Sequence, residues 1–118
     1  MSLTVQTEQR GDVVVVSVAG ELDMATAPQL QDQITDLLDK GRNRLVFDLA
    51  DLSFCDSTGL SVFVRAKNSC DEAGGVVRLA APQRGVLRIL EVSGLVEVLH
   101  TYPTVEQAVA GDPTPASS

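Results

Sequence analysis

The chain has 118 residues, of which 44% are hydrophobic, and a formal net charge of -7 at pH 7. This length suits one domain, which buries roughly two thirds of the surface of its unfolded chain. The acidic balance argues against partners that are themselves anionic, both nucleic acids and anionic membrane surfaces.

Neither a membrane span nor a secretory signal is predicted. No run approaches the ~20 apolar residues that cross a bilayer. The first four residues lack the basic and apolar regions of a signal peptide. We therefore expect a cytoplasmic protein that does not insert into a membrane.

The two cysteines predict neither a disulfide framework nor a metal site. Cys55 falls at the end of a predicted strand, Cys70 lies within a predicted helix, and the only histidine, His100, is on another segment. Metal sites usually need four ligands, so this set is too small. We expect both thiols to be small, partly buried side chains, and the protein to need no cofactor.

Strand and helix patterns alternate along the chain. Apolar runs and alternation predict strands over residues 3–7, 12–18, 44–49, 76–80 and 96–99. Helical spacing predicts helices over residues 27–40, 60–73 and 83–92, with a short last helix after residue 104. The segments 26–29 and 104–107 have the spacing of capping boxes, which predicts that Thr26 and Thr104 begin helices. The continuous run from Val13 to Val16 predicts a strand that is buried on both faces.

Strands that alternate with helices predict an α/β fold with parallel strand pairs and right-handed crossovers. The first two strands are joined only by the turn at residues 10–12, which is too short for a crossover, so they should pair antiparallel. The prediction is a mixed β-sheet of about four to five strands with about four helices, in one domain over residues 1–110. Residues 111–118 show no apolar periodicity and are expected to form a disordered tail.

The segment from Leu52 to Leu60 is the strongest candidate for a functional site. It lies where a strand pattern gives way to a helical one, and sites in open α/β sheets lie at the carboxyl ends of strands. Unpaired N–H groups and the positive end of the dipole suit a phosphate at a helix start. Ser57 is therefore placed either to accept a phosphoryl group or to cap the helix, and the local pattern favours the two readings equally.

The residues next to Ser57 also have more than one possible role. Asp56 is itself a candidate N-cap, a role compatible with presenting Ser57. Thr58 is a second hydroxyl that competes as the phosphoryl acceptor. Gly59 either lets a partner's backbone approach closely or relieves crowding within the chain.

Enzyme chemistry is not predicted. A serine hydrolase needs a base near its nucleophile, and the residues around Ser57 do not form a Gly-x-Ser-x-Gly elbow. An aspartic protease needs two carboxylates that share a site, and the run from Asp56 to Gly59 occurs once. A phosphate loop of the Gly-x4-Gly-Lys type is missing from the sequence. The chain has the features of a kinase substrate without kinase machinery of its own.

Short segments spread over residues 3 to about 110 resemble, in order and spacing, those of one known family. They are Gly20-Glu21-Leu22-Asp23 after the second strand, Asp51-Leu52-Ser53-Phe54 before the serine, the pair Asp56-Ser57, and Pro82, Val86, Leu87 and Ser93-Gly94-Leu95 around the third long helix. The pattern resembles the bacterial anti-sigma factor antagonists, whose fold is the STAS domain. The departures are small: Cys55 before the aspartate, Thr58 after the serine, and Ser61 where a small residue is common.

This resemblance implies that Ser57 is the regulatory residue. The unphosphorylated protein would bind an anti-sigma factor with serine kinase activity and so free a sigma factor. Phosphorylation of Ser57 from ATP would switch that binding off, and a PP2C-type phosphatase would reset it. The resemblance also implies partner contacts at these residues: Glu21, Asp23, Asp56, Ser57, Thr58, Gly59 and Leu60.

Two alternatives within the same fold remain open at this point. STAS modules also serve as accessory subunits of membrane transport systems, where binding is constitutive. The second alternative is a scaffold subunit in a stress-sensing assembly. The intact pair Asp56-Ser57 favours the switch.

Overall fold

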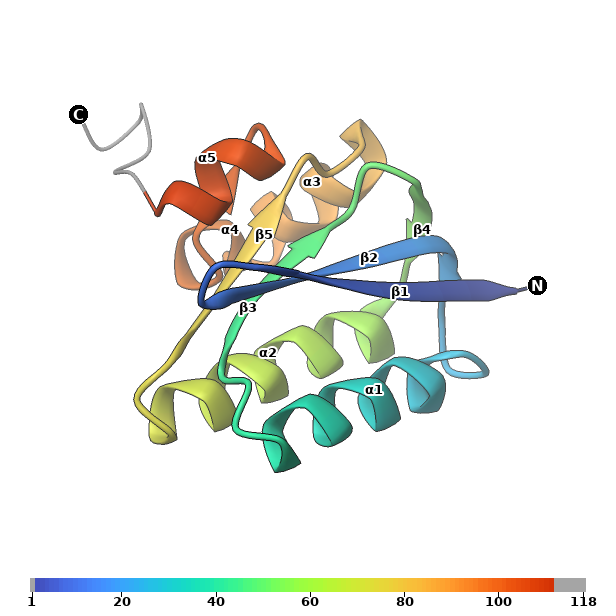
Figure 1. Cartoon of the computed structure of the whole chain (residues 1–118). Helices are drawn as coiled ribbons and strands as arrows, with labels where there is room; N and C mark the ends of the chain where they lie inside the picture. The colour runs from blue at the N-terminus through green and yellow to red at the C-terminus, as the bar shows by residue number, and fades with distance from the viewer. Residues whose placement is uncertain (1, 112–118) are drawn as a thin grey trace.

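A computed structural model describes residues 2–111 (Figure 1). After an initial pair of strands, strands and helices alternate as predicted except at two places, where β4 follows β3 and α4 follows α3. The elements are β1 (Leu3–Arg10), β2 (Val13–Leu22), α1 (Ala27–Asp39), β3 (Arg44–Asp48), β4 (Leu52–Cys55), α2 (Ser57–Glu72), β5 (Val76–Ala80), α3 (Arg84–Val92), α4 (Leu95–Val98), β6 (Thr101–Tyr102) and α5 (Val105–Ala110). Apart from Gly111, the predicted disordered tail lies outside the described residues.

The sheet is mixed, which confirms the predicted fold class. Its order is β1-β2-β3-β5-β6, with β4 added alongside β2. The β1–β2 pair is antiparallel, and the other pairs are parallel. Strand β2 has two partners in succession: Val14 to Ser17 pair with β3, and Gly20 to Leu22 pair with β4. The carboxyl end of β2 therefore lies beside the segment that leads into α2.

The main core lies between the sheet and the helices α1, α2 and α3. Figure 1 shows α1 and α2 side by side along one face of the sheet, with both N-termini at the end where β2 and β4 finish. Helix α5 packs on the other face through Ala108. Val13 to Val16 are all buried, as the run of β-branched residues predicted. Phe47 and Phe63 meet edge to face in the main core, with ring centroids 5.1 Å apart.

The predicted strand over residues 96–99 was wrong. Residues 96–99 were expected to form a strand, but Leu95–Val98 forms the short helix α4, and the amide of Leu99 donates to the carbonyl of Leu95. Gly94, at φ +77°, turns the chain into this helix. The last strand of the sheet is instead Thr101–Tyr102. A four-residue apolar run fits either conformation, so its pattern alone does not decide between them.

The segment before the serine forms the strand β4, which lies outside the predicted strand over residues 44–49. In β4, Leu52 and Cys55 are buried while Ser53 and Phe54 are exposed. This pattern lacks both a continuous apolar run and strict alternation. A register shift between Gly20 and Glu21 in β2 accommodates it. No helix within residues 2–111 combines the length and apolarity needed to cross a membrane.

Candidate functional site

The start of α2 shows that Ser57 is not the N-cap, which was one of the two roles that the sequence left open for it. Asp56 is the N-cap: its backbone is extended, and its carboxylate accepts a hydrogen bond from the amide of Gly59 at 3.0 Å. Ser57 is the first residue of the helix and is exposed. Because Asp56 caps the helix, the Ser57 side chain is not needed for that purpose. Thr58 follows it and is half-buried, so Ser57 is the more accessible hydroxyl.

Gly59 is required for packing within the chain. A Cβ atom at this position would lie 2.7 Å from Cγ of Leu22 and 2.8 Å from Sγ of Cys55. Of the two readings from the sequence, relief of internal crowding therefore has a direct structural reason. Leu60 is 8% exposed and forms part of the same core. Contact of Gly59 and Leu60 with a partner stays a prediction.

Gly59→Ala is expected to lower the free energy of unfolding by about 1–3 kcal/mol, because an added methyl group overpacks the junction of β2, β4 and α2. The higher helix propensity of alanine offsets up to about 1 kcal/mol of this. Gly85→Ala in α3 is the matched control, since nothing lies within 4 Å of its Cβ position. It should stabilise the protein. Urea unfolding of both variants measures the difference, and equal shifts in the same direction would contradict the packing role.

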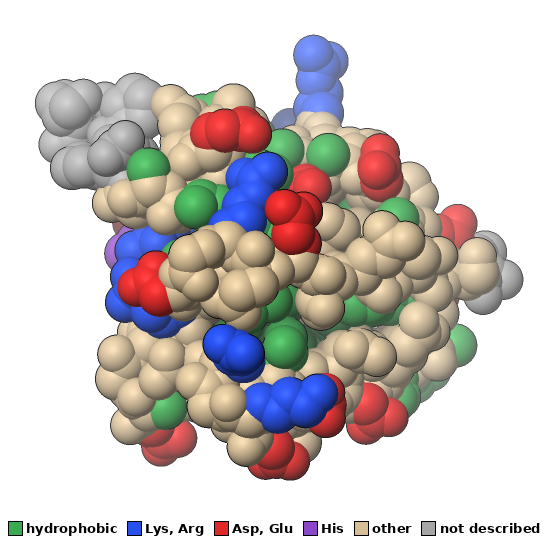
Figure 2. All heavy atoms as spheres, in the orientation of Figure 1, with side chains coloured by type: hydrophobic (Ala, Val, Ile, Leu, Met, Phe, Trp, Pro, Cys, Tyr) green, Lys and Arg blue, Asp and Glu red, His purple; other side chains and the backbone are tan. Residues whose placement is uncertain are grey.

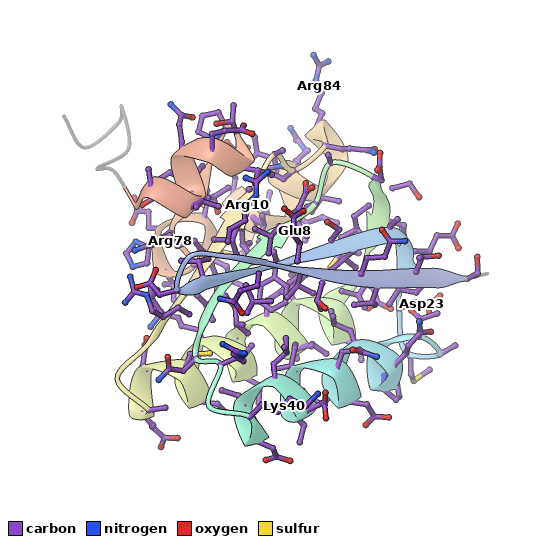
Figure 3. All side chains as sticks on the ribbon, in the orientation of Figure 1. Glu8, Arg10, Asp23, Lys40, Arg78 and Arg84 are labelled. Carbon is purple, nitrogen blue, oxygen red and sulfur yellow. The ribbon has the colours of Figure 1, made fainter. Side chains whose placement is uncertain are left out.

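The turn after β2 reaches the same edge of the sheet as Ser57. The amide of Asp56 donates to the carbonyl of Leu22 at 3.1 Å, which ties the ends of β2 and β4 together. Asp23 follows directly and lies on the loop that enters α1 (Figure 3). Asp23 and the start of α2 are therefore neighbours on one rim.

Asp23 also has a structural role that the sequence did not reveal. Its Oδ1 accepts hydrogen bonds from the amides of Ala25 and Thr26, each at 3.0 Å. The predicted capping box at Thr26 is wrong, because the hydroxyl of Thr26 donates to the carbonyl of Glu21 at 2.8 Å and accepts from the amide of Asp23. The carboxylate of Asp23 instead closes the turn that precedes α1, and the amide of Gln29 donates to the backbone carbonyl of Thr26. At the second predicted box, Thr104 does cap α5, with its hydroxyl accepting from the amide of Gln107.

Glu21 lies at the same edge of the sheet but on the opposite face. It pairs with Phe54, while the next pair, Leu22 and Cys55, enters the core against α2. Because side chains alternate along a strand, Glu21 and Phe54 point away from α2. One carboxylate oxygen of Glu21 is buried without a hydrogen-bond partner among the described residues. The structure therefore brings Asp23 to the rim beside Ser57 and turns Glu21 away from it.

Two hollows flank Ser57, and the sequence did not predict them. One, of about 360 Å³, lies toward α1 and is lined by Met24 and Pro28 among others. The other, of about 410 Å³, lies toward α4 and is lined by Leu95 among others. Ser57, Ser61 and Arg65 line both hollows. Their spacing of four residues is the one signal in the sequence that places them on one face of a helix.

Both thiols are fully buried, including that of Cys55 beside the site. Burial, with a smaller contribution from the carboxylate of Asp56, raises the pKa of Cys55 to about 12. Burial and the carboxylate of Asp71 raise the pKa of Cys70 to about 11. Both thiols are protonated at neutral pH, and only thiolates attack efficiently. Among residues 2–111 there is also no group of three or more His, Cys, Asp and Glu side chains that could hold a metal.

Known proteins are similar to this chain over most of its length. The sequence matches the STAS domain over residues 4–108. It is 31% identical over 99 residues to the anti-sigma-B factor antagonist of Bacillus subtilis, which covers 84% of this chain and 90% of that protein. The crystal structure of an anti-sigma factor antagonist from Mycobacterium paratuberculosis is 32% identical, with 93% of each chain covered and a TM-score of 0.84.

A third similarity concerns the fold alone. The structure of the Bacillus cell fate determinant SpoIIAA in its phosphorylated form is 24% identical to this chain. It covers 92% of this chain and 98% of that one, with a TM-score of 0.71. Taken with the family match and the two closer similarities, the chain belongs to the STAS domain family of anti-sigma factor antagonists.

Proposed function

We propose that this protein is a non-enzymatic, cytoplasmic partner switch. Its unphosphorylated form binds an anti-sigma factor that is also a serine kinase, and a sigma factor is thereby freed. The observation that carries the proposal is the exposed Ser57 at the first position of α2, directly after an aspartate that already caps the helix. The antagonist function of the relatives supports it, and so does the phosphorylated form described for SpoIIAA.

The start of α2 suits the product of the proposed reaction. The hydroxyl oxygen of Ser57 attacks the γ-phosphorus of ATP held by the kinase, the bond to the β-phosphate oxygen breaks, and ADP leaves. The hydroxyl proton passes to a base of the kinase. The first-turn N–H groups and the helix dipole stabilise the new phosphate, so α2 need not rearrange.

The phosphate acts on the partner through its charge. It adds about -1.5 to -2 at neutral pH, next to Asp56 and on the rim that also carries Asp23. A kinase surface that fits a neutral hydroxyl would have to desolvate this charge without a counter-ion, which is strongly unfavourable. Phosphorylation therefore releases the partner. A PP2C-type phosphatase hydrolyses the phosphoserine and restores binding.

The direct test is phosphorylation by the cognate kinase. Incubation with this kinase and ATP should add one phosphate, and mass spectrometry should place it on Ser57. Ser57→Ala should abolish incorporation, whereas Thr58→Ala and Ser61→Ala should retain it. Phosphate found on Thr58 alone, or no phosphate at all, would refute the proposal.

Asp23→Asn should slow association with the kinase while leaving stability nearly unchanged. Asparagine keeps the oxygen that accepts from the amides of Ala25 and Thr26, but it removes the charge that attracts a basic partner surface. Asp23→Lys is the less clean variant, because it removes the hydrogen bonds as well, at a cost of about 0.5–2 kcal/mol. Stopped-flow binding at low and high salt, alongside thermal melts, separates the two effects. A wild-type association rate for Asp23→Asn would remove this charge from the interface.

A further inference from the structure

The exposed face of α2 carries a row of three residues that starts at Ser57. Ser57, Ser61 and Arg65 are all exposed and four residues apart. Each of them lines both hollows, so the row forms a ridge between the hollow toward α1 and the hollow toward α4. A protein that reaches the hydroxyl of Ser57 has to place its surface across this ridge.

Arg65 is one of five basic residues without a local counter-ion among residues 2–111, and of these five it alone lines the two hollows beside Ser57. Four of the nine basic residues form ion pairs with nearby carboxylates: Arg10 with Glu8, Lys40 with Asp36, Arg44 with Asp12 and Lys67 with Asp71. Figure 2 shows blue and red side chains in contact at several points, and Figure 3 shows Arg10 beside Glu8.

The helical neighbours of Arg65 explain why it is unpaired. The residues three and four positions away are Ser61, Val62, Asn68 and Ser69, none of which is acidic. Within residues 2–111, no carboxylate lies within ion-pair distance of Arg65. An exposed guanidinium thus remains uncompensated on the same helix face as Ser57, in a protein whose net charge is -7.

We propose that Arg65 is a second anchor of the partner interface and pairs with a carboxylate of the kinase. This inference rests on the proposed function. Eight residues of helix separate Ser57 from Arg65 by about 12 Å, which is well within one standard interface. The guanidinium presents a planar set of donors that binds a carboxylate in two-point fashion, and its stem can pack along the hollows.

Together with Asp23, an ion pair at Arg65 would fix the orientation in which the kinase binds. Asp23 requires a cation on the partner and Arg65 requires an anion, so a partner surface that is uniformly basic does not fit. Opposite charges at two separate points fix how the kinase is oriented on α2. They also discriminate against kinases that lack the carboxylate, because such a kinase would cover Arg65 without pairing it.

A pair of charge-reversal variants tests this inference. Arg42 is the matched control: it is exposed, lies just beyond the end of α1 that is farther from Asp23, and also has no ion pair among the described residues. Arg65→Glu and Arg42→Glu each change the net charge by -2, from -7 to -9, so long-range attraction to the kinase changes equally. Arg65→Glu should bind the kinase at least ten-fold more weakly than Arg42→Glu. It should also raise the KM for phosphorylation with little change in kcat, and melt at the same temperature. Equal affinity of the two variants would overturn the inference.

A second experiment identifies the chemistry of the contact. Arg65→Lys introduces an amine that a water-soluble carbodiimide can join to a carboxylate in contact with it. In the complex, we expect a crosslinked peptide that joins position 65 to an Asp or Glu of the kinase. The same treatment of Arg42→Lys should give no crosslink at position 42. Absence of the crosslink at position 65, in a complex where Ser57 is still phosphorylated, would overturn the proposed pair.

The outcome also separates this inference from the proposed function. If the wild-type protein binds the kinase and Ser57→Asp does not, but Arg65→Glu behaves as its control, only the role of Arg65 fails. If the wild-type protein neither binds the kinase nor accepts phosphate, the proposed function itself fails.

Discussion

Ser57→Asp is expected to weaken binding of the anti-sigma partner by about 100-fold, and phosphorylation of Ser57 to weaken it further. Leaving a charge unpaired in a buried contact costs about 2–5 kcal/mol, and every 1.4 kcal/mol corresponds to about a ten-fold change in affinity. Aspartate carries a single negative charge, whereas a phosphoserine carries about -1.5 to -2, so the substitution reproduces only part of the effect. Titration calorimetry of the three forms gives the comparison directly.

Two neutral substitutions separate charge from shape at Ser57. Ser57→Asn has nearly the same shape as Ser57→Asp without the charge, so it should retain most of the affinity. Ser57→Ala should bind and never be released by ATP. Equal affinity of the wild-type, Ser57→Asp and phosphorylated forms would contradict the electrostatic switch. That result would instead favour constitutive binding, as expected of an accessory subunit of a membrane transport system.

Phe63→Ala is expected to lower the free energy of unfolding by about 3–5 kcal/mol, the largest stability change that we predict. The ring of Phe63 is fully buried and packs edge to face against Phe47 from β3. This contact fixes α2, and therefore Ser57, on the sheet. Since domains of this size have about 5–15 kcal/mol in total, the variant would be near its limit of stability.

The matched control for Phe63 is Phe54, the same residue type at an exposed position. Phe54 is 47% exposed at the rim of the sheet, and Phe54→Ala should cost less than about 1 kcal/mol. Denaturant unfolding of both variants, with the m-value checked for each, gives the two free energies. If Phe54→Ala were the more destabilising, the assignment of the core would be wrong.

The sequence predicted those elements in which the hydrophobic pattern matches the burial found in the structure. The valine run of β2 is apolar on both sides because helices cover both faces of the sheet there, and α2 follows from an apolar stripe of ordinary length. The pattern failed where tertiary contacts decide the conformation. Strand β4 exists because the end of β2 offers it a partner, and neither the exposed Ser53 nor the exposed Phe54 signals a strand. Leu95–Val98 is too short for its periodicity to choose between strand and helix.

The same distinction applies to the site. The placement of Ser57 at a helix start, and of Asp23 at the same rim, follows from chain order and from the rule that parallel strands end at one edge. The turn closed by the carboxylate of Asp23 could not be predicted, because Thr26 has the capping pattern and its hydroxyl instead donates to the carbonyl of Glu21. The position of Arg65 between two hollows depends on how α1 and α4 pack beside α2, which no local pattern records.

The succession of two partners along β2 has a mechanical consequence. One ten-residue strand is hydrogen-bonded first to β3 and then to β4, so the loop that bears Asp23 and the segment that bears Ser57 are fastened to a single backbone ladder. This ladder restrains both segments in place. We therefore expect phosphorylation of Ser57 to change the electrostatic potential of this rim rather than the conformation of the backbone.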